Sequence, residues 1–195
     1  MNKISYALGL SIGNNFQNSG ITNLDVEDFV KGLKAILNEE KPEISYDEAK
    51  QIINDYFMKL QDEKLGLNKK AGEEFLAINK NKDGVVTLPS GLQYQVLTKG
   101  TGSKPSAADS VKCHYHGTLI NGTVFDSSVE RGEPAVFGVS QVIPGWVEAL
   151  QLMETGSKWR LFIPSDLAYG EQGAGGAIEP NSTLIFDVEL IDIVK

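Results

Sequence analysis

The chain has 195 residues, of which 41% are hydrophobic and 23% are charged, and this composition is typical of a globular protein with one large domain or two small ones. Its formal net charge of −8 argues against a nucleic-acid partner, because such proteins carry a basic face. The sequence contains no run of about 18 apolar residues, so we expect no membrane span.

Two short amphipathic helices are predicted within the first 44 residues. The first helix ends near Gly20 and has an apolar stripe at helical spacing, made of Ile4, Leu8, Ile12 and Phe16. The second begins after Asp25, a good N-cap, and ends before Pro42; its stripe is made of Val26, Phe29, Val30, Leu33, Ile36 and Leu37. Each helix therefore presents one apolar face.

A long helix is predicted to follow, from residue 45 to about residue 80. Ser45 and Glu48 match a capping box, in which each side chain satisfies an orphan amide at the helix start. No proline interrupts the helical pattern between Pro42 and Pro89. At 1.5 Å per residue the helix would be about 50 Å long, more than a globular domain of this size can cover.

The two short helices cannot enclose their own apolar stripes. A second copy of the same segment is the simplest partner, so we expect a homodimer through the N-terminal helices. The alternative is a monomer whose helical cap packs on the C-terminal domain. We expect the long helix to carry the cap away from that domain, which favours the dimer.

The turn Asn81–Gly84 marks a change from helical spacing to alternation with a period of two. Three strands are predicted, with inward-facing residues Val111, Cys113 and Tyr115; Trp159, Leu161 and Ile163; and Leu184, Phe186, Val188 and Leu190. One short helix begins at Pro144 and places Trp146, Leu150 and Met153 on one face. We expect an α+β protein. Its parts are a helical dimerisation domain (1–44), a long connecting helix (45–82) and a domain with an antiparallel sheet around one short helix (83–195).

Three short segments of the C-terminal domain combine aromatic or branched side chains with Gly, Pro or Ser: Val124-Phe125-Asp126-Ser127-Ser128, Val142-Ile143-Pro144-Gly145-Trp146 and Ala168-Tyr169-Gly170. In this order and spacing, residues 88 to 195 resemble the FK506-binding protein (FKBP) family of peptidyl-prolyl cis-trans isomerases. The helical region, through its layout and Ser5-Tyr6-Ala7-Leu8-Gly9, resembles the N-terminal module of bacterial Mip-like and FkpA-like isomerases. In that module, intertwined helices pair two chains.

The activity implied by this resemblance needs an apolar cavity and neither a metal nor a cofactor. The barrier to peptide-bond rotation is about 18–20 kcal/mol. The planar amide is strongly dipolar and the twisted transition state is less so. An apolar, water-free cavity therefore favours the twisted state.

The resemblance implies that Trp146 forms the floor on which the proline ring sits. The amide of Ile143 and the hydroxyl of Tyr169 would bind substrate carbonyls, and Asp126 would act electrostatically at the edge, near the hydroxyl of Tyr115. The walls and rim would be formed by Phe125, Phe137, Val142, Phe186, Ala135, Ala174, Ala177 and Ile178.

Ala135, Ala174 and Ala177 depart from the family pattern, which commonly has phenylalanine, histidine and isoleucine there. Each missing large side chain removes about 1.5–3 kcal/mol of apolar burial against a ligand. The rim should therefore be shallow, and a macrolide such as FK506 should bind weakly. The segment Gly173–Ala177 should be mobile because its glycines cost entropy to order.

Several of these residues also have simpler interpretations. Trp146, Phe137 and Phe186 taken singly are typical of a core, and Asp126 is typical of a turn or cap. His114 and His116 lie on one face of a strand, but without a third ligand we interpret them as solvent-facing. Cys113 should be a buried small hydrophobe.

The leading functional hypothesis is a peptidyl-prolyl isomerase that acts on unfolded or partly folded, proline-containing chains, with chaperone activity. The alternative is a dimeric holdase that depends little on isomerisation; a pocket used only for scaffolding is disfavoured. The single cysteine and the lack of a signal peptide favour the cytoplasm, with a periplasmic form as the alternative if a leader has been removed.

Overall fold

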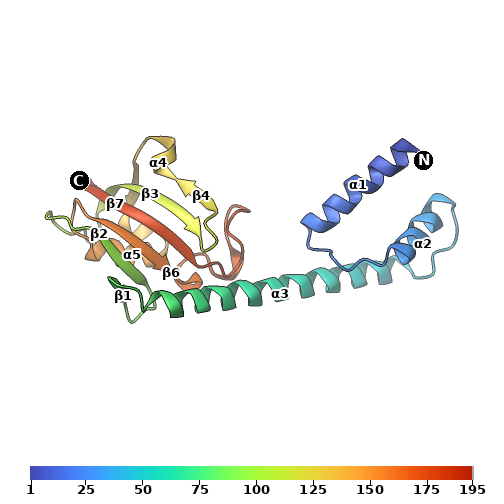
Figure 1. Cartoon of the computed structure of the whole chain (residues 1–195), viewed down its shortest axis with the longest axis horizontal. Coiled ribbons are helices and arrows are strands. Elements are labelled where there is room, and N and C mark those ends of the chain that lie inside the picture. Colours follow the sequence, from blue (N-terminus) through green and yellow to red (C-terminus); the bar gives the residue numbers. More distant parts are fainter. Residues whose placement is uncertain (195) are drawn as a thin grey trace. The chain divides into compact units, whose positions relative to one another are not determined.

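The computed structural model describes residues 1–194 and divides into two compact units, Met1–Asp62 and the part of the chain from Glu63 onward. The boundary falls inside one helix, α3 (Tyr46–Asn79), which contributes its first half to one unit and its second half to the other (Figure 1). The division at residues 44 and 82 expected from the sequence stays a prediction.

The first unit consists of α1 (Lys3–Asn18), α2 (Val26–Leu37) and the first half of α3. The carboxylate of Asp25 accepts hydrogen bonds from the amides of Glu27 and Asp28, which confirms the expected N-cap of α2. The hydroxyl of Ser45 accepts a hydrogen bond from the amide of Glu48 at the start of α3. The long helix expected from residue 45 to about residue 80 is therefore confirmed, over Tyr46–Asn79.

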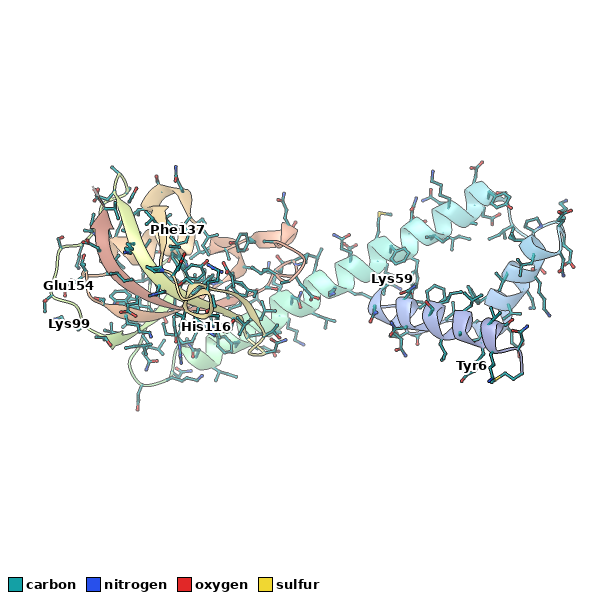
Figure 2. All side chains as sticks on the ribbon, turned by 90° about the horizontal axis from the view of Figure 1, so that it is seen from above. Tyr6, Lys59, Lys99, His116, Phe137 and Glu154 are labelled. Carbon is teal, nitrogen blue, oxygen red and sulfur yellow. The ribbon has the colours of Figure 1, made fainter. Side chains whose placement is uncertain are left out.

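The apolar stripes of α1 and α2 have little to pack against within their own unit. Neither helix contains a buried residue. The aromatic rings of Phe16 and Phe29 do meet edge to face, with centroids 5.4 Å apart. Ile4 and Leu37 remain 75% and 71% exposed, and Tyr6 projects outward from α1 (Figure 2). As expected from their spacing, these stripes are left uncovered by the chain itself.

The second unit is built on a seven-stranded antiparallel sheet, in which the strands follow the order β1-β2-β6-β7-β3-β4 and β5 pairs with β3 (Figure 1). The strands are β1 (Val85–Thr87), β2 (Gln93–Thr98), β3 (Ser110–Leu119), β4 (Val124–Ser127), β5 (Ala135–Gly138), β6 (Lys158–Ile163) and β7 (Leu184–Val194). The helices are α4 (Ser128–Arg131) and α5 (Pro144–Leu152), with single turns at Val139–Gln141, Ser165–Leu167 and Gly170–Gln172.

The core lies between α5 and one face of the sheet. The three predicted strands bury the predicted residues, because alternate side chains of β3, β6 and β7 point toward α5. Pro144 occupies the first turn of α5, and Trp146 and Leu150 are buried on its inner face, with Met153 just beyond its end. The expected α+β fold is confirmed.

The sequence pattern did not anticipate β1, β2, β4, β5 or α4. These elements have six residues or fewer, and several alternate poorly between buried and exposed positions, so no period of two stands out. The segment from Val124 is a strand that continues directly into α4. Within residues 1–194, no helix is both long and apolar enough to cross a membrane.

Candidate active site

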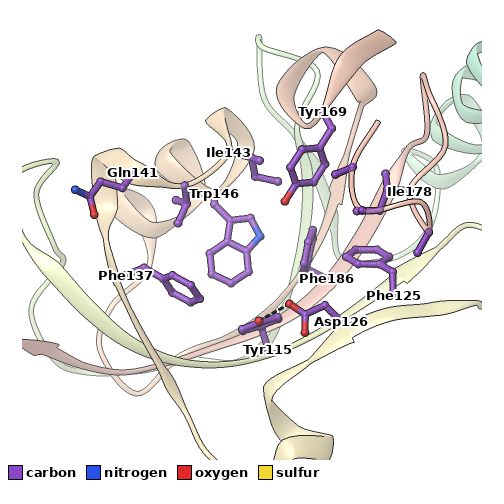
Figure 3. A pocket seen from close by; sticks show the side chains of 14 residues that line it. Tyr115, Phe125, Asp126, Phe137, Gln141, Ile143, Trp146, Tyr169, Ile178 and Phe186 are labelled. Atoms are coloured by element: carbon purple, nitrogen blue, oxygen red, sulfur yellow. Dashed lines mark hydrogen bonds between the residues drawn. The ribbon is translucent and has the colours of Figure 1, made fainter. Parts of the chain in front are cut away.

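A cavity of about 500 Å³ opens between α5, the sheet and the segment after β6 (Figure 3). Twelve of the thirteen residues proposed from the sequence line it: Tyr115, Phe125, Asp126, Phe137, Val142, Ile143, Trp146, Tyr169, Ala174, Ala177, Ile178 and Phe186. They come from β3, β4, β5, β7, α5 and two loops, so only the folded sheet brings them together.

Trp146 lies at the base of this cavity and is 4% exposed. Three aromatic rings meet the indole edge to face: Tyr115 at 5.5 Å, Phe186 at 5.3 Å and Phe137 at 5.8 Å between centroids. Such contacts hold a ring in one orientation. The indole N–H is buried and has no hydrogen-bond acceptor within residues 1–194.

A glycine makes room for the aromatic wall. The rings of Phe125 and Phe186 meet edge to face at 5.3 Å, and both lie over Gly117 on β3. A Cβ atom at Gly117 would come within 2.7 Å of Phe125 and 2.8 Å of Phe186, closer than real contacts allow. Gly117 therefore sets the depth of this wall, a role that sequence reasoning missed.

The polar edge of the cavity is a network of three side chains. The hydroxyl of Tyr115 donates to Asp126 Oδ2 at 2.5 Å, Arg131 Nη2 donates to the Tyr115 hydroxyl at 2.7 Å, and Arg131 Nη1 pairs with Asp126 Oδ1. Partial burial acts to raise the pKa of Asp126, but the hydrogen bonds from Tyr115 and Arg131 outweigh it and lower that pKa. Burial and the bond to Asp126 raise the pKa of Tyr115. The edge therefore holds an ionised carboxylate and a neutral phenol.

Two further lining residues, Ile143 and Tyr169, carry hydrogen-bond donors. Ile143 precedes the first turn of α5, and its amide has no acceptor within residues 1–194. The hydroxyl of Tyr169 points into the space above Trp146 in Figure 3, and the Tyr169 side chain is partly exposed at the rim. These are the two groups that the family resemblance implies for the binding of substrate carbonyls.

Ala135 was wrongly placed at the rim, because the structure leaves it outside the cavity lining. It pairs with Cys113 across β5 and β3 and packs against the core.

Sequence reasoning also missed Gln141 and Arg131, and it named Gly175 only as part of the segment Gly173–Ala177. Gln141 and Gly175 line the cavity, and Arg131 completes the polar edge. Arg131 lies at the end of α4, five residues after Asp126, and that short helix was the signal that would have placed its guanidinium beside the carboxylate.

The other reactive side chains lie away from the cavity. His114 and His116 are half-buried rather than solvent-facing, because their rings hydrogen-bond the hydroxyls of Ser128 and Ser127. Within residues 1–194, no group of three or more His, Cys, Asp or Glu side chains is arranged to hold a metal ion. Cys113 is fully buried, and its burial raises the pKa of its thiol to about 12.

Comparison with known proteins accounts for nearly the whole chain. Residues 101–191 match the family described as FKBP-type peptidyl-prolyl cis-trans isomerase. Residues 1–96 match the family described as the domain amino terminal to FKBP-type peptidyl-prolyl isomerase.

Individual relatives agree with these matches. The outer membrane protein MIP of Legionella longbeachae is 49% identical over 99% of this chain and 85% of the relative. The crystal structure of FkpA from Escherichia coli covers 98% of this chain and 95% of its own, with a TM-score of 0.80 and 36% identity. A peptidyl-prolyl cis-trans isomerase from Pseudomonas syringae is 45% identical, with a TM-score of 0.63; the match covers 67% of this chain and 96% of the solved one.

Proposed function

This chain belongs to the FKBP-type peptidyl-prolyl cis-trans isomerases, and we propose that the cavity above Trp146 is where it turns the X-Pro bond. The observation that carries this proposal is the closed aromatic base of that cavity. Trp146, Tyr115, Phe137 and Phe186 form a mutually packed set beneath an opening large enough for a proline ring.

The cavity can act by withdrawing the bond from water. In the planar ground state the imide carries a large dipole that water stabilises, and twisting the bond reduces that dipole. An apolar surrounding therefore raises the energy of the planar state more than that of the twisted state. Each 1.36 kcal/mol taken from the barrier corresponds to about a tenfold rate increase.

The polar groups at the cavity edge orient the chain around that bond. We assign the Ile143 amide to the carbonyl that precedes proline and the Tyr169 hydroxyl to a neighbouring carbonyl. Asp126 acts through its charge, because rotation requires no proton to leave. Arg131 neutralises part of that charge and holds Tyr115 and Asp126 in place.

The substrate class we propose is the unfolded or partly folded polypeptide that contains proline. The rim next to the cavity carries only methyl side chains at Ala174 and Ala177, so it offers little apolar area beyond the proline ring. A shallow rim tolerates varied neighbouring residues. For the same reason we propose weak binding of FK506-like macrolides.

A homodimer through the first unit is the second part of the proposal. Helices of 16 and 12 residues with no buried side chain cannot pair stably on their own. Burying one large apolar side chain contributes about 1.5–3 kcal/mol, so covering stripes that include Leu8 and Leu37 would contribute many times that amount. A second copy offers an identical apolar face, as symmetric dimers require.

A matched pair of substitutions on α1 tests the dimer. Ile12→Asp places a charge in the apolar stripe, whereas Asn14→Asp places one on the exposed opposite side of the helix. We expect Ile12→Asp to be monomeric by light scattering and Asn14→Asp to keep twice the chain mass. Equal masses for the two variants would overturn the proposed interface.

Chaperone activity is a second candidate function, favoured by the uncovered apolar residues of the first unit. A pair of chains would present two cavities to one unfolded client. The holdase alternative requires that suppression of aggregation survive loss of the isomerase cavity. Phe125→Ala in an aggregation assay separates the two roles.

We propose the cytoplasm as the compartment, on the support of the single buried Cys113, which needs no oxidising environment. One relative is named an outer membrane protein. Fractionation of the source cells tests this proposal, and recovery of the chain in the periplasmic extract would overturn it.

The decisive test of the site is a peptide isomerisation assay on a short X-Pro substrate. We expect micromolar protein to accelerate the reaction. An FK506-type ligand added in excess should inhibit it and should broaden the NMR resonances of Trp146 and Tyr169. Inhibition with shifts confined to residues outside the cavity would show that the reaction occurs elsewhere.

A further inference from the structure

The second half of α3 contacts the segment that overhangs the cavity. Asn68 Nδ2 donates to the carbonyl of Pro180 at 2.9 Å and lies 3.3 Å from Glu179 Oε2. One turn earlier, Lys64 Nζ pairs with Glu179 Oε1 at 2.7 Å, and the Leu65 carbonyl accepts from Asn181 Nδ2 at 3.3 Å. All of these residues belong to the unit from Glu63 onward.

The same segment reaches the cavity at its other end. Ala174, Ala177 and Ile178 line the cavity, and Ile178 is only two residues from Pro180. Ala174 and Ile178 exchange two backbone hydrogen bonds, of 2.9 and 3.0 Å, which close the tip of the loop. The amide of Asn181 donates to the carbonyl of Gly170 at 2.8 Å and closes its base, directly after Tyr169. The helix thus holds the base of a loop whose tip lies over the proposed site.

The close approach of helix and loop depends on Gly72. A Cβ atom there would lie 2.2 Å from Thr183 Oγ1 and 3.2 Å from Thr183 Cβ, and Thr183 is buried. The helix also contains Gly66, where a Cβ would meet nothing within 4 Å. Of the two glycines that lower the helix propensity of α3, only Gly72 is required by packing.

We propose that Asn68 is a positioning residue of the isomerase: from α3 it holds the base of the loop Gly170–Thr183, and this sets the loop's grip on the bound chain. The inference rests on the proposed function, that is, on the cavity above Trp146 being the site. We assign the positioning role to Asn68 rather than to Lys64. The Lys64–Glu179 ion pair is half exposed, and exposed ion pairs contribute little to stability.

Holding the loop in advance lowers the entropy that substrate binding must remove. Loss of the Asn68 hydrogen bonds should therefore raise KM by about three- to tenfold, the range of one to two such bonds. The floor of the cavity does not contact Asn68, so kcat should change by less than about twofold.

The test compares paired variants of the full chain. Asn68→Ala removes the hydrogen-bond donor. Asn68→Asp removes it and also places a second carboxylate beside Glu179. The hydrogen bond from Lys64 lowers the pKa of Glu179 against the opposing effect of partial burial. Lys70→Ala, at an exposed position of the same helix where Lys70 pairs with Glu74, is the control. Gly72→Ala and Gly66→Ala form the second pair.

Two readouts are measured: KM and kcat on an X-Pro peptide, and hydrogen exchange of the Ala174, Ile178 and Asn181 amides without substrate. We expect faster hydrogen exchange of the loop amides and a higher KM in Asn68→Asp, Asn68→Ala and Gly72→Ala. Both effects should be larger in Asn68→Asp than in Asn68→Ala. Lys70→Ala and Gly66→Ala should resemble the parent. Unchanged KM in all Asn68 variants would overturn the inference.

Phe125→Ala, measured beside these variants, separates the proposal that the cavity is the site from the proposal that Asn68 positions the loop. If Phe125→Ala loses activity while the Asn68 variants keep their KM, the site stands and the positioning role is wrong. If Phe125→Ala keeps activity and the Asn68 variants only loosen the loop, the cavity itself is not the site.

Discussion

In the unit from Glu63 onward, Leu92, Leu161 and Leu184 are fully buried, whereas in Met1–Asp62 Leu8 and Leu37 are 59% and 71% exposed. The difference follows from geometry. A sheet that curves around α5 encloses a core, while two short helices beside half of a long one cannot. The sheet unit therefore buries its own apolar side chains, whereas the helical unit needs a partner surface to cover its apolar stripes.

Removal of residues 1–62 would break this comparison most visibly. The remaining chain keeps its own core and the second half of α3, so we expect it to fold, to be monomeric and to retain peptide isomerisation. Its effect on the refolding of a protein substrate should be lost. Light scattering and parallel assays with the full chain measure these outcomes; a monomeric full chain would contradict the expectation.

Within the sheet unit, the largest point effects should come from the cavity. Phe125→Ala should lower kcat/KM by tenfold or more, corresponding to at least about 1.4 kcal/mol of transition-state stabilisation. Trp146→Ala should also lower it, but it will cost about 3–5 kcal/mol of stability, because the indole is buried. Val136→Ala, on an exposed position of β5, is the matched control, and urea unfolding separates activity from stability.

Asp126→Ala should have a smaller effect, a loss of a few-fold in kcat/KM. The substitution removes the partner of Tyr115 and Arg131 but leaves the apolar floor intact. Kinetics at saturating and limiting peptide concentrations would measure it. A loss equal to that of Phe125→Ala would mean that the carboxylate takes part in the chemistry.

The smallest effect should be that of pH on the isomerisation rate, which we expect to stay flat from about pH 5 to about pH 9 because no proton is transferred. The pKa of Asp126 lies below its ordinary 3.8. Its contribution to the stability of the folded protein is therefore present above pH 3.8 and is lost as the pH falls through the folded pKa. The pKa of Tyr115 lies above its ordinary 10.0. Its contribution to the stability of the folded protein is therefore present below pH 10.0 and is lost as the pH rises through the folded pKa. A bell-shaped profile within the window would contradict this view.

Much of this architecture could be predicted from the chain alone, and the reasons differ by element. The long helix was readable because Ser45 caps it and no proline interrupts it. Strands β3 and β7 were readable because buried and more exposed side chains alternate along most of their length. Strand β6 was readable because Trp159, Leu161 and Ile163 follow the same spacing, although Phe162 between them is also buried. The short strands β4 and β5 were not, since segments of four residues show no period. Ala135 was placed at the rim by the family resemblance alone, and the structure leaves it outside the cavity lining.

The sequence by itself determined the three N-terminal helices, helix α5 and strands β3, β6 and β7, and it showed where their apolar faces lie, because these properties depend on residues close together in the chain. The three motifs on which the proposed proline site rests are local for the same reason. Only the tertiary structure decided that Gly117 makes room for the aromatic wall, that Arg131 reaches Asp126, and that Asn68 holds a loop more than a hundred residues further along. Those contacts arise when the sheet closes, and no local pattern records them.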